Sequence, residues 1–270
     1  MRISLSTSKW YDNIWAALIF FTRLPFWRLH EPPKECYRSV VEHWPLVGWF
    51  TGCIMATVLY FASMIFPYTV AVLLAIATRL LITGALHEDG LTDFFDGFGG
   101  GGNNRQRILD IMKDSRIGTY GVVGIILYGL LLFTSLVSMP PYIAAISIVA
   151  ADPFAKMVAG QIIMMMPYAR TEDEAKAKVV YRKMNIRAGI SLAVQGLLQL
   201  ALFFYLAPAI MLANWEWIIF VPCLVMYFLY MMIWRKLRGY TGDCCGALFL
   251  LIELSFYLTI VALFTMGSKM

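Results

Sequence analysis

The chain has 270 residues, of which 60% are hydrophobic and only 14% are charged, and its mean hydropathy is +0.69. Charged residues make up about a quarter of an ordinary soluble domain, so this composition excludes that class and indicates an integral membrane protein. The net charge of +5 comes from basic residues spread over loops, a distribution that does not indicate a nucleic-acid partner.

Seven apolar segments are long enough to cross a bilayer, which predicts an all-α, polytopic transmembrane bundle in a single domain covering residues 1–270. We expect spans near 46–66, 69–86, 120–137, 143–166, 188–206, 217–234 and 247–266. The segment 10–22 is too short to cross comfortably, so we expect an interfacial helix anchored by its aromatic residues. An eighth crossing by this segment is the alternative.

Lys and Arg residues divide the connections between spans into two kinds. Most of the 22 basic residues lie before the first span or in the loops 88–118, 168–187 and 235–243. The short connections contain none of them, namely 67–68, 138–142 and 207–216. By the positive-inside rule, the polar loops that carry the candidate chemistry face the cytoplasm.

The polar stretch His87–Gly97 follows the second apolar run and carries the strongest functional signal. If the stretch is helical, Asp89, Asp93 and Asp96 fall within about 60° of arc on one face. Crowded carboxylates repel one another and are costly to desolvate unless a cation lies among them. Oxygen ligands favour Mg²⁺, which commonly pairs carboxylates with substrate phosphates. A solvated helix end is the simpler alternative.

Two segments that follow extend this prediction. The glycine-rich run 98–104 is interpreted as a loop that brings backbone N–H groups near an anion, or as a flexible connector. A short amphipathic helix is expected over 105–115, capped by Asn103 or Asn104. On this helix and just after it, Asp114 is a further candidate metal ligand, and the candidate phosphate-binding residues are Arg107, Lys113 and Arg116. Pairing between surface charges is the alternative.

The last polar loop contains Thr241, Gly242 and Asp243, which are candidates for holding a phosphate or a hydroxyl group. A plain turn in which Asp243 caps the following helix is the alternative.

Four ionisable residues fall within predicted spans, where charges are costly and often functional. Asp152 and Lys156 are four residues apart, so we expect them to neutralise each other on one helix. Arg79 has a potential partner in Glu253 on another helix. Lys156 reaching toward the acidic site is the alternative. We expect all five cysteines to be reduced, because their spacing matches neither a metal site nor a disulfide framework.

Five motifs in order resemble the cobalamin synthase family, adenosylcobinamide-GDP ribazoletransferase. The first is His87–Gly97, which is similar to the family signature H-x-D-G-L-x-D-x-x-D-G. The others are Phe21–Pro25, Trp44–Gly48, Met112–Gly121 and Thr241–Ala247. The chain departs from the family pattern at Lys156, where many members are expected to have Arg; the positive charge is kept without the bidentate fork.

The resemblance implies a Mg²⁺-dependent, multi-pass enzyme of the bacterial inner membrane. Such an enzyme joins adenosylcobinamide-GDP to α-ribazole or its 5′-phosphate and releases GMP. Asp89, Asp93, Asp96 and Asp114 would then hold Mg²⁺. Asp93, His87 or Asp89 would take the proton of the attacking hydroxyl. Substrate-binding candidates are Arg23, Arg107, Lys113, Arg116, Lys156, Thr241, Gly242 and Asp243.

Two other functions stay open from the sequence. One is a different aspartate-rich membrane transferase acting on a diphosphate substrate. The other is a cation-coupled secondary transporter, although transporters usually place such sites near the bilayer midplane. The sequence does not fix the oligomeric state, and it allows a homo-oligomer within the lipid bilayer.

Overall fold

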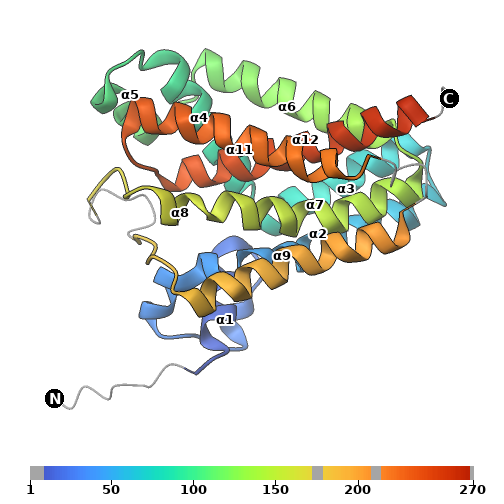
Figure 1. The fold of residues 1–270 in the computed structure, drawn as a ribbon, viewed down its shortest axis with the longest axis horizontal. Helices are drawn as coiled ribbons and strands as arrows, with labels where there is room; N and C mark the ends of the chain where they lie inside the picture. Colours follow the sequence, from blue (N-terminus) through green and yellow to red (C-terminus); the bar gives the residue numbers. More distant parts are fainter. Residues whose placement is uncertain (1–8, 172–178, 208–213, 268–270) are drawn as a thin grey trace.

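The computed structural model describes residues 9–171, 179–207 and 214–267, and these form a bundle of long helices that run side by side (Figure 1). Lipid offers no hydrogen-bond partners for backbone N–H and C=O groups, whereas an α-helix pairs these groups internally. Apolar runs of this length therefore form helices. The long helices are α2 (Trp44–Ser63), α3 (Tyr68–Thr83), α6 (Thr119–Val137), α7 (Pro141–Gly160), α9 (Ile186–Leu206), α11 (Glu216–Leu237) and α12 (Gly242–Gly267).

The shorter elements gather mostly at one end of this bundle. In Figure 1, α1, α5 and α8 all lie toward the left-hand end, whereas the end of α12 lies at the right. The short elements are α1 (Asp12–Phe21), the 3₁₀ helices η1 (Phe26–Arg28) and η2 (Lys34–His43), α4 (Leu86–Gly100), α5 (Arg105–Lys113) and α8 (Ile162–Met165). Chemistry that depends on polar side chains is therefore expected at this end.

The predicted multi-span bundle is confirmed. Among the described residues six helices are long and apolar enough to cross a membrane, and a seventh span results if α3 and α4 are counted as one broken span. The axes of α3 and α4 differ by 90°. Gly84 and Ala85 both have left-handed backbone angles, with φ of 63° and 54°. Left-handed residues cannot continue a right-handed helix, so the span ends at Thr83 and the chain turns sharply.

The N-terminal segment forms a helix that is too short for an eighth crossing. Its 10 residues, Asp12–Phe21, rise about 15 Å, half of a hydrocarbon core of about 30 Å. Ala16, Ala17 and Phe21 are buried against the rest of the protein. The interfacial position predicted for this helix stays a prediction.

The expectation of a glycine loop over 98–104 is wrong for its first half, because α4 continues through Gly100. Among these glycines only Gly102 has a positive φ, at 61°. A side chain at Gly97 or Gly101 would overlap the side chain of Met112 or Ile108 on α5. These glycines therefore allow α4 and α5 to pack closely. The predicted cap of α5 is confirmed at Asn104, whose side chain accepts a hydrogen bond from Arg107 N at 3.1 Å.

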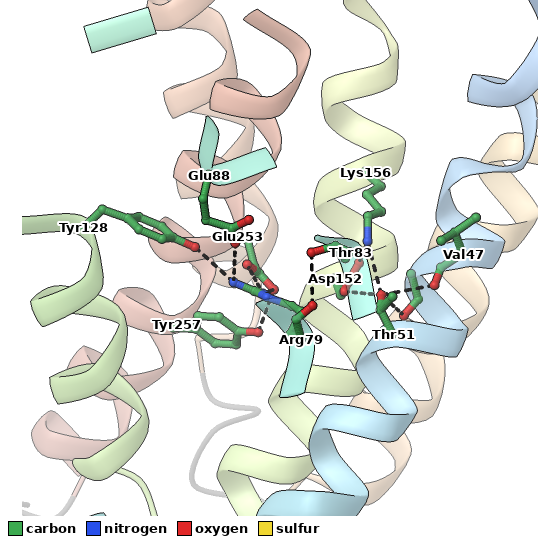
Figure 2. Close-up of polar contacts among 11 residues, drawn as sticks. Val47, Thr51, Arg79, Thr83, Glu88, Tyr128, Asp152, Lys156, Glu253 and Tyr257 are labelled. Carbon is green, nitrogen blue, oxygen red and sulfur yellow. Dashed lines mark hydrogen bonds and ion pairs between the residues drawn. The ribbon is translucent and has the colours of Figure 1, made fainter. Parts of the chain in front are cut away.

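A buried ion pair and its polar neighbours connect four helices inside the bundle (Figure 2). Arg79 on α3 donates from Nη1 to both carboxylate oxygens of Glu253 on α12, each at 2.7 Å. Its Nη2 lies 3.1 Å from the hydroxyl of Tyr128 on α6 and 3.8 Å from Glu88 on α4. Tyr257 donates a further hydrogen bond to Glu253 at 2.9 Å. The predicted contact between Arg79 and Glu253 is confirmed.

A second buried group joins α2 to α7. Lys156 and Asp152 form an ion pair on α7, as predicted from their spacing. Asp152 also accepts a hydrogen bond from Thr51 on α2 at 2.7 Å. Figure 2 shows this group beside the Arg79 group, with Lys156 directed toward Asp152 and Thr51. Both carboxylates are therefore neutralised inside the bundle.

We predict that Arg79→Met destabilises the protein by about 3–5 kcal/mol, because the substitution leaves the Glu253 carboxylate buried without its cation. The double variant Arg79→Met/Glu253→Met should recover a large part of this loss. The unfolding midpoint of each variant in detergent measures the effect. Arg187→Met, which removes an exposed arginine, is the matched control. A double variant whose loss of stability equals the sum of the losses in Arg79→Met and Glu253→Met alone would contradict the coupling.

Candidate active site

A cavity of about 310 Å³ lies where α1, α2, α4 and the start of α12 meet the segments on either side of residues 172–178. Four of the five sequence motifs contribute to its lining. From the motifs come Phe21, Trp44, His87, Asp89, Gly90, Gly242, Asp243, Cys245 and Gly246. The remaining lining residues are Phe20, Leu86, Tyr168, Arg170, Val179 and Tyr181. The fold therefore gathers segments that are distant in sequence around one cavity.

Close packing of α4 on α12 brings two carboxylates to this cavity. A Cβ atom at Gly90 would lie 3.1 Å from Asp243 Cα, and one at Gly246 would lie 3.1 Å from the carbonyl oxygen of His87. Larger residues would push the helices apart, so the two glycines set the separation. Asp89 and Asp243 flank this contact, and both line the cavity.

The start of α12 is fixed by a hydroxyl cap. The Thr241 side chain accepts a hydrogen bond from Cys244 N at 3.3 Å, which satisfies one of the free N–H groups of the first turn. Asp243 lies inside that first turn, so the alternative in which Asp243 caps the helix is wrong. The carboxylate of Asp243 instead belongs to the cavity wall, near the positive end of the helix dipole.

The segment after α8 adds a cation and a phenol to the cavity. Ala169 N donates to Tyr240 O at 2.8 Å and Tyr240 N donates to Pro167 O at 3.0 Å, which ties this segment to the loop before α12. Arg170 is anchored by a 2.7 Å hydrogen bond from Nη2 to Leu109 O on α5. Burial raises the pKa of Tyr168 to about 12, so its hydroxyl is neutral near pH 7.

The predicted aspartates have different surroundings. Asp89 is exposed and lines the cavity, whereas Asp93 is half-buried one turn further along α4. Asp96 is buried, and its two oxygens accept hydrogen bonds from Gly118 N at 2.7 Å and from Gly121 N at 2.8 Å. Asp96 thereby joins α4 to the first turn of α6.

Asp114 and three predicted cations lie outside the cavity lining. Arg116 donates to both oxygens of Asp114, with a shortest distance of 2.7 Å. These hydrogen bonds lower the pKa of the Asp114 carboxyl to about 2. Arg107 and Lys113 are exposed on α5. The structure therefore does not bring these residues to Asp89 and Asp243.

The other predicted site residues are placed around the cavity rather than in its wall. Lys156 is buried, with Nζ 4.4 Å from the ring centroid of Phe249. Thr241 is buried at the helix start. Arg23 is exposed, and its backbone N–H donates to Ile82 O at 2.7 Å, next to the turn between α3 and α4.

The donor atoms at the cavity suit a hard cation. Among the described residues, no group of three or more His, Cys, Asp or Glu side chains is arranged to hold a metal ion. Mg²⁺, however, is commonly held by one or two carboxylates together with substrate phosphates and water. Asp89 and Asp243 supply two carboxylates from separate helices, and Arg170 adds a cation to the same cavity lining. This set fits Mg²⁺ bound with a phosphorylated substrate.

Sequence reasoning missed several lining residues. Arg170 was one of six basic residues in the loop 168–187, and nothing in its local sequence distinguishes it. Tyr168 and Tyr181 were missed because nothing in their local sequence distinguishes them either. The available signal was membership of a recognised motif, which Trp44 shares with Phe21, Gly90, Cys245 and Gly246, although none of them was assigned to the site.

The chain is similar to known proteins along most of its length. The family model described as cobalamin-5-phosphate synthase matches residues 13–261. A protein of Vibrio parahaemolyticus named adenosylcobinamide-GDP ribazoletransferase is 35% identical over 259 residues, covering 92% of this chain and 91% of the relative. Proteins with the same name from Shewanella frigidimarina and Leptospira interrogans are each 34% identical, and the alignments cover 94% and 93% of this chain and 97% and 95% of the relatives.

No solved structure matches the chain. The family match covers the helices that build the cavity as well as the motifs that line it. The predicted resemblance is therefore confirmed, and the chain belongs to the cobalamin-5-phosphate synthase family.

Proposed function

We propose that this protein transfers the adenosylcobinamide-phosphate moiety of adenosylcobinamide-GDP to α-ribazole or its 5′-phosphate. The products are GMP and adenosylcobalamin or its 5′-phosphate. The observation that carries the proposal is that Asp89, Asp243 and Arg170 line the same cavity. The names of the aligned relatives supply the substrates.

In this proposal a ribose hydroxyl attacks the phosphorus nearest the cobinamide. The new P–O bond forms as the bond to the GMP oxygen breaks, and GMP leaves as the phosphate monoester. Asp89 or His87, both at the cavity, takes the hydroxyl proton, and Asp93 on the next turn of α4 is the third candidate. Arg170 offsets charge on the diphosphate, a role suited to its guanidinium.

We further propose that Mg²⁺ is bound with the diphosphate by Asp89 and Asp243, with Asp93 adjacent on α4. When bound, the ion would neutralise the diphosphate and stabilise charge on the departing GMP. Asp96 and Asp114 are less suited to direct ligation, because neither lines the cavity and each uses both carboxylate oxygens to hold Gly118 and Gly121 or Arg116.

The protein is a multi-pass membrane protein, and we propose that it lies in the bacterial inner membrane with the cavity facing the cytoplasm. The distribution of Lys and Arg supports this orientation, since the segments 88–118 and 168–187, which contribute residues to the cavity, are among the basic ones. A reporter protein that works only in the cytoplasm should be active when it is fused after the basic loop 235–243, and a reporter that works only outside the cytoplasm should be inactive there.

The direct test of the activity uses purified protein in detergent with adenosylcobinamide-GDP, α-ribazole and Mg²⁺. We expect equal amounts of GMP and adenosylcobalamin, and none of either when the divalent ion is chelated. A protein that releases no GMP with any divalent ion would contradict the proposal.

We predict that Asp89→Asn and Asp93→Asn each lower kcat at least 100-fold while the protein stays folded. Each change keeps the side-chain volume and removes a negative charge at the proposed metal and proton-acceptor position. GMP release at saturating substrate measures the effect, and the unfolding midpoint confirms the fold. Retained turnover in both variants would refute the assigned roles.

We predict the opposite pattern for Asp96→Asn. The amide has one carbonyl oxygen in place of two carboxylate oxygens, so one of the N–H groups of Gly118 and Gly121 loses its acceptor. The free energy of unfolding should fall by about 1–3 kcal/mol. The activity per folded molecule should fall less than in Asp89→Asn. A variant that unfolds like the native protein but no longer responds to Mg²⁺ would instead favour metal ligation by Asp96.

A further inference from the structure

Three nearly parallel rings form part of the cavity wall, and we call them the aromatic platform: Phe21, Trp44 and His87. The ring planes of Phe21 and Trp44 differ by 15°, and those of Phe21 and His87 by 14°. Centroid distances are 5.3 Å, 6.1 Å and, between Trp44 and His87, 5.8 Å. Because the three centroid distances are similar, the ring centroids form a triangle, and the rings do not stack in a single column.

The platform packs against residues of α12 and α7 that lie outside the cavity lining. Phe249 on α12 meets the His87 ring edge-on, with centroids 4.8 Å apart. Lys156 in turn lies over the Phe249 ring, and its charge is balanced by Asp152. A rigid aromatic surface binds a second flat ring at a low cost in conformational entropy.

Two nitrogen atoms of the platform have no hydrogen-bond partner among the described residues. Trp44 Nε1 and His87 Nε2 are buried and form no hydrogen bond with any described residue. Both residues are at least nine-tenths buried, with exposed fractions of 1% and 3%. Buried polar atoms are normally hydrogen-bonded, and an indole N–H is only a donor. A bound ring with an acceptor nitrogen would satisfy Trp44.

The neighbours of the platform favour an apolar ring over a polar one. Phe20, Leu86 and Val179 line the same cavity and offer no side-chain hydrogen bonds. Guanine presents several donors and acceptors along its edge, and this apolar part of the wall would leave them unpaired. The charged part of the lining, Asp89, Asp243 and Arg170, is assigned in the proposed function to the ion, the diphosphate and the acceptor hydroxyl. A benzimidazole has an apolar six-membered ring and, in a riboside, one free acceptor nitrogen. This pattern matches one donor on an aromatic surface.

We propose that the aromatic platform binds the benzimidazole ring of the ribazole substrate, with Trp44 Nε1 donating to its free nitrogen. The assignment rests on the proposed function, and it makes Trp44 a determinant of specificity for the acceptor substrate. The guanine of the other substrate then binds elsewhere. The acceptor ribose, attached to the benzimidazole, extends toward Asp89, which lines the same cavity.

The test is Trp44→Phe, which keeps an aromatic ring and removes the N–H donor. We expect the KM for α-ribazole to rise about tenfold, the loss expected for one buried hydrogen bond. The KM for adenosylcobinamide-GDP and kcat should stay within twofold. A rise in the KM for adenosylcobinamide-GDP alone would overturn the proposal and assign the platform to guanine. Equal rises in both KM values would overturn it as well.

A binding measurement tests the hydrogen bond without turnover. Calorimetry compares α-ribazole with an analogue in which C–H replaces the free ring nitrogen. The native protein should bind the analogue about tenfold more weakly, and Trp44→Phe should bind both compounds equally. A native protein that does not distinguish the two compounds would overturn the proposal. This comparison also holds if Trp44→Phe folds poorly, because the native protein alone gives the first result.

The matched control is Trp49→Phe, the same change five residues along α2. Trp49 Nε1 donates to Gln195 O at 2.7 Å, and Trp49 does not line the cavity. We expect both KM values to be unchanged in this variant. If the native protein binds α-ribazole but releases no GMP, the proposed function fails and the platform stands. If it turns over while Trp44→Phe keeps a native KM for α-ribazole, the platform alone fails.

Discussion

The position of the cavity depends on one buried interaction, the ion pair between the guanidinium of Arg79 and its carboxylate partners. The guanidinium joins α3 to Glu253 on α12 and lies 3.8 Å from Glu88 on α4 (Figure 2). Glu88 stands between His87 and Asp89, which both line the cavity. Separating such charges in a low-dielectric interior is costly, so the three helices are fixed relative to one another. The ion pair that stabilises the bundle therefore also sets where the carboxylate of Asp89 lies.

The second buried ion pair, between Lys156 and Asp152, supports a different part of the cavity wall. Lys156, neutralised by Asp152, contacts the face of Phe249, and Phe249 meets the ring of His87. This chain of contacts leads from Asp152 and Lys156, in the second half of α7, to the aromatic platform. A residue that the family resemblance suggested for substrate binding thus supports the cavity wall from inside the bundle. Its single charge suffices for a cation–π contact, for which the fork of an arginine is not required.

The sequence predicted contacts that follow from helical spacing and charge, because these depend on local geometry. The pair Asp152–Lys156 and a cap of α5 at Asn104, one of two candidates, were predicted correctly. Glu253 was named only as a potential partner of Arg79, because the sequence does not show which distant helices are neighbours, and the structure brings the two together. It did not predict the 90° turn after α3, since Ala85 adopts a left-handed angle that its residue type does not favour. Arg170 was also missed, because only the tertiary fold brings its loop to α4 and α12.

The acidic motif shows why angular position on a helix does not determine function. Asp89 and Asp96 differ by only about 20° around the helix, yet they lie about 10 Å apart along it. That separation brings Asp89 to the cavity and Asp96 to the first turn of α6, where two backbone N–H groups occupy its oxygens. A carboxylate bound in this way needs no cation to offset its burial. The spacing that suggests one metal cluster can therefore equally arise from a helix that presents one aspartate to a substrate and uses another to hold its neighbour.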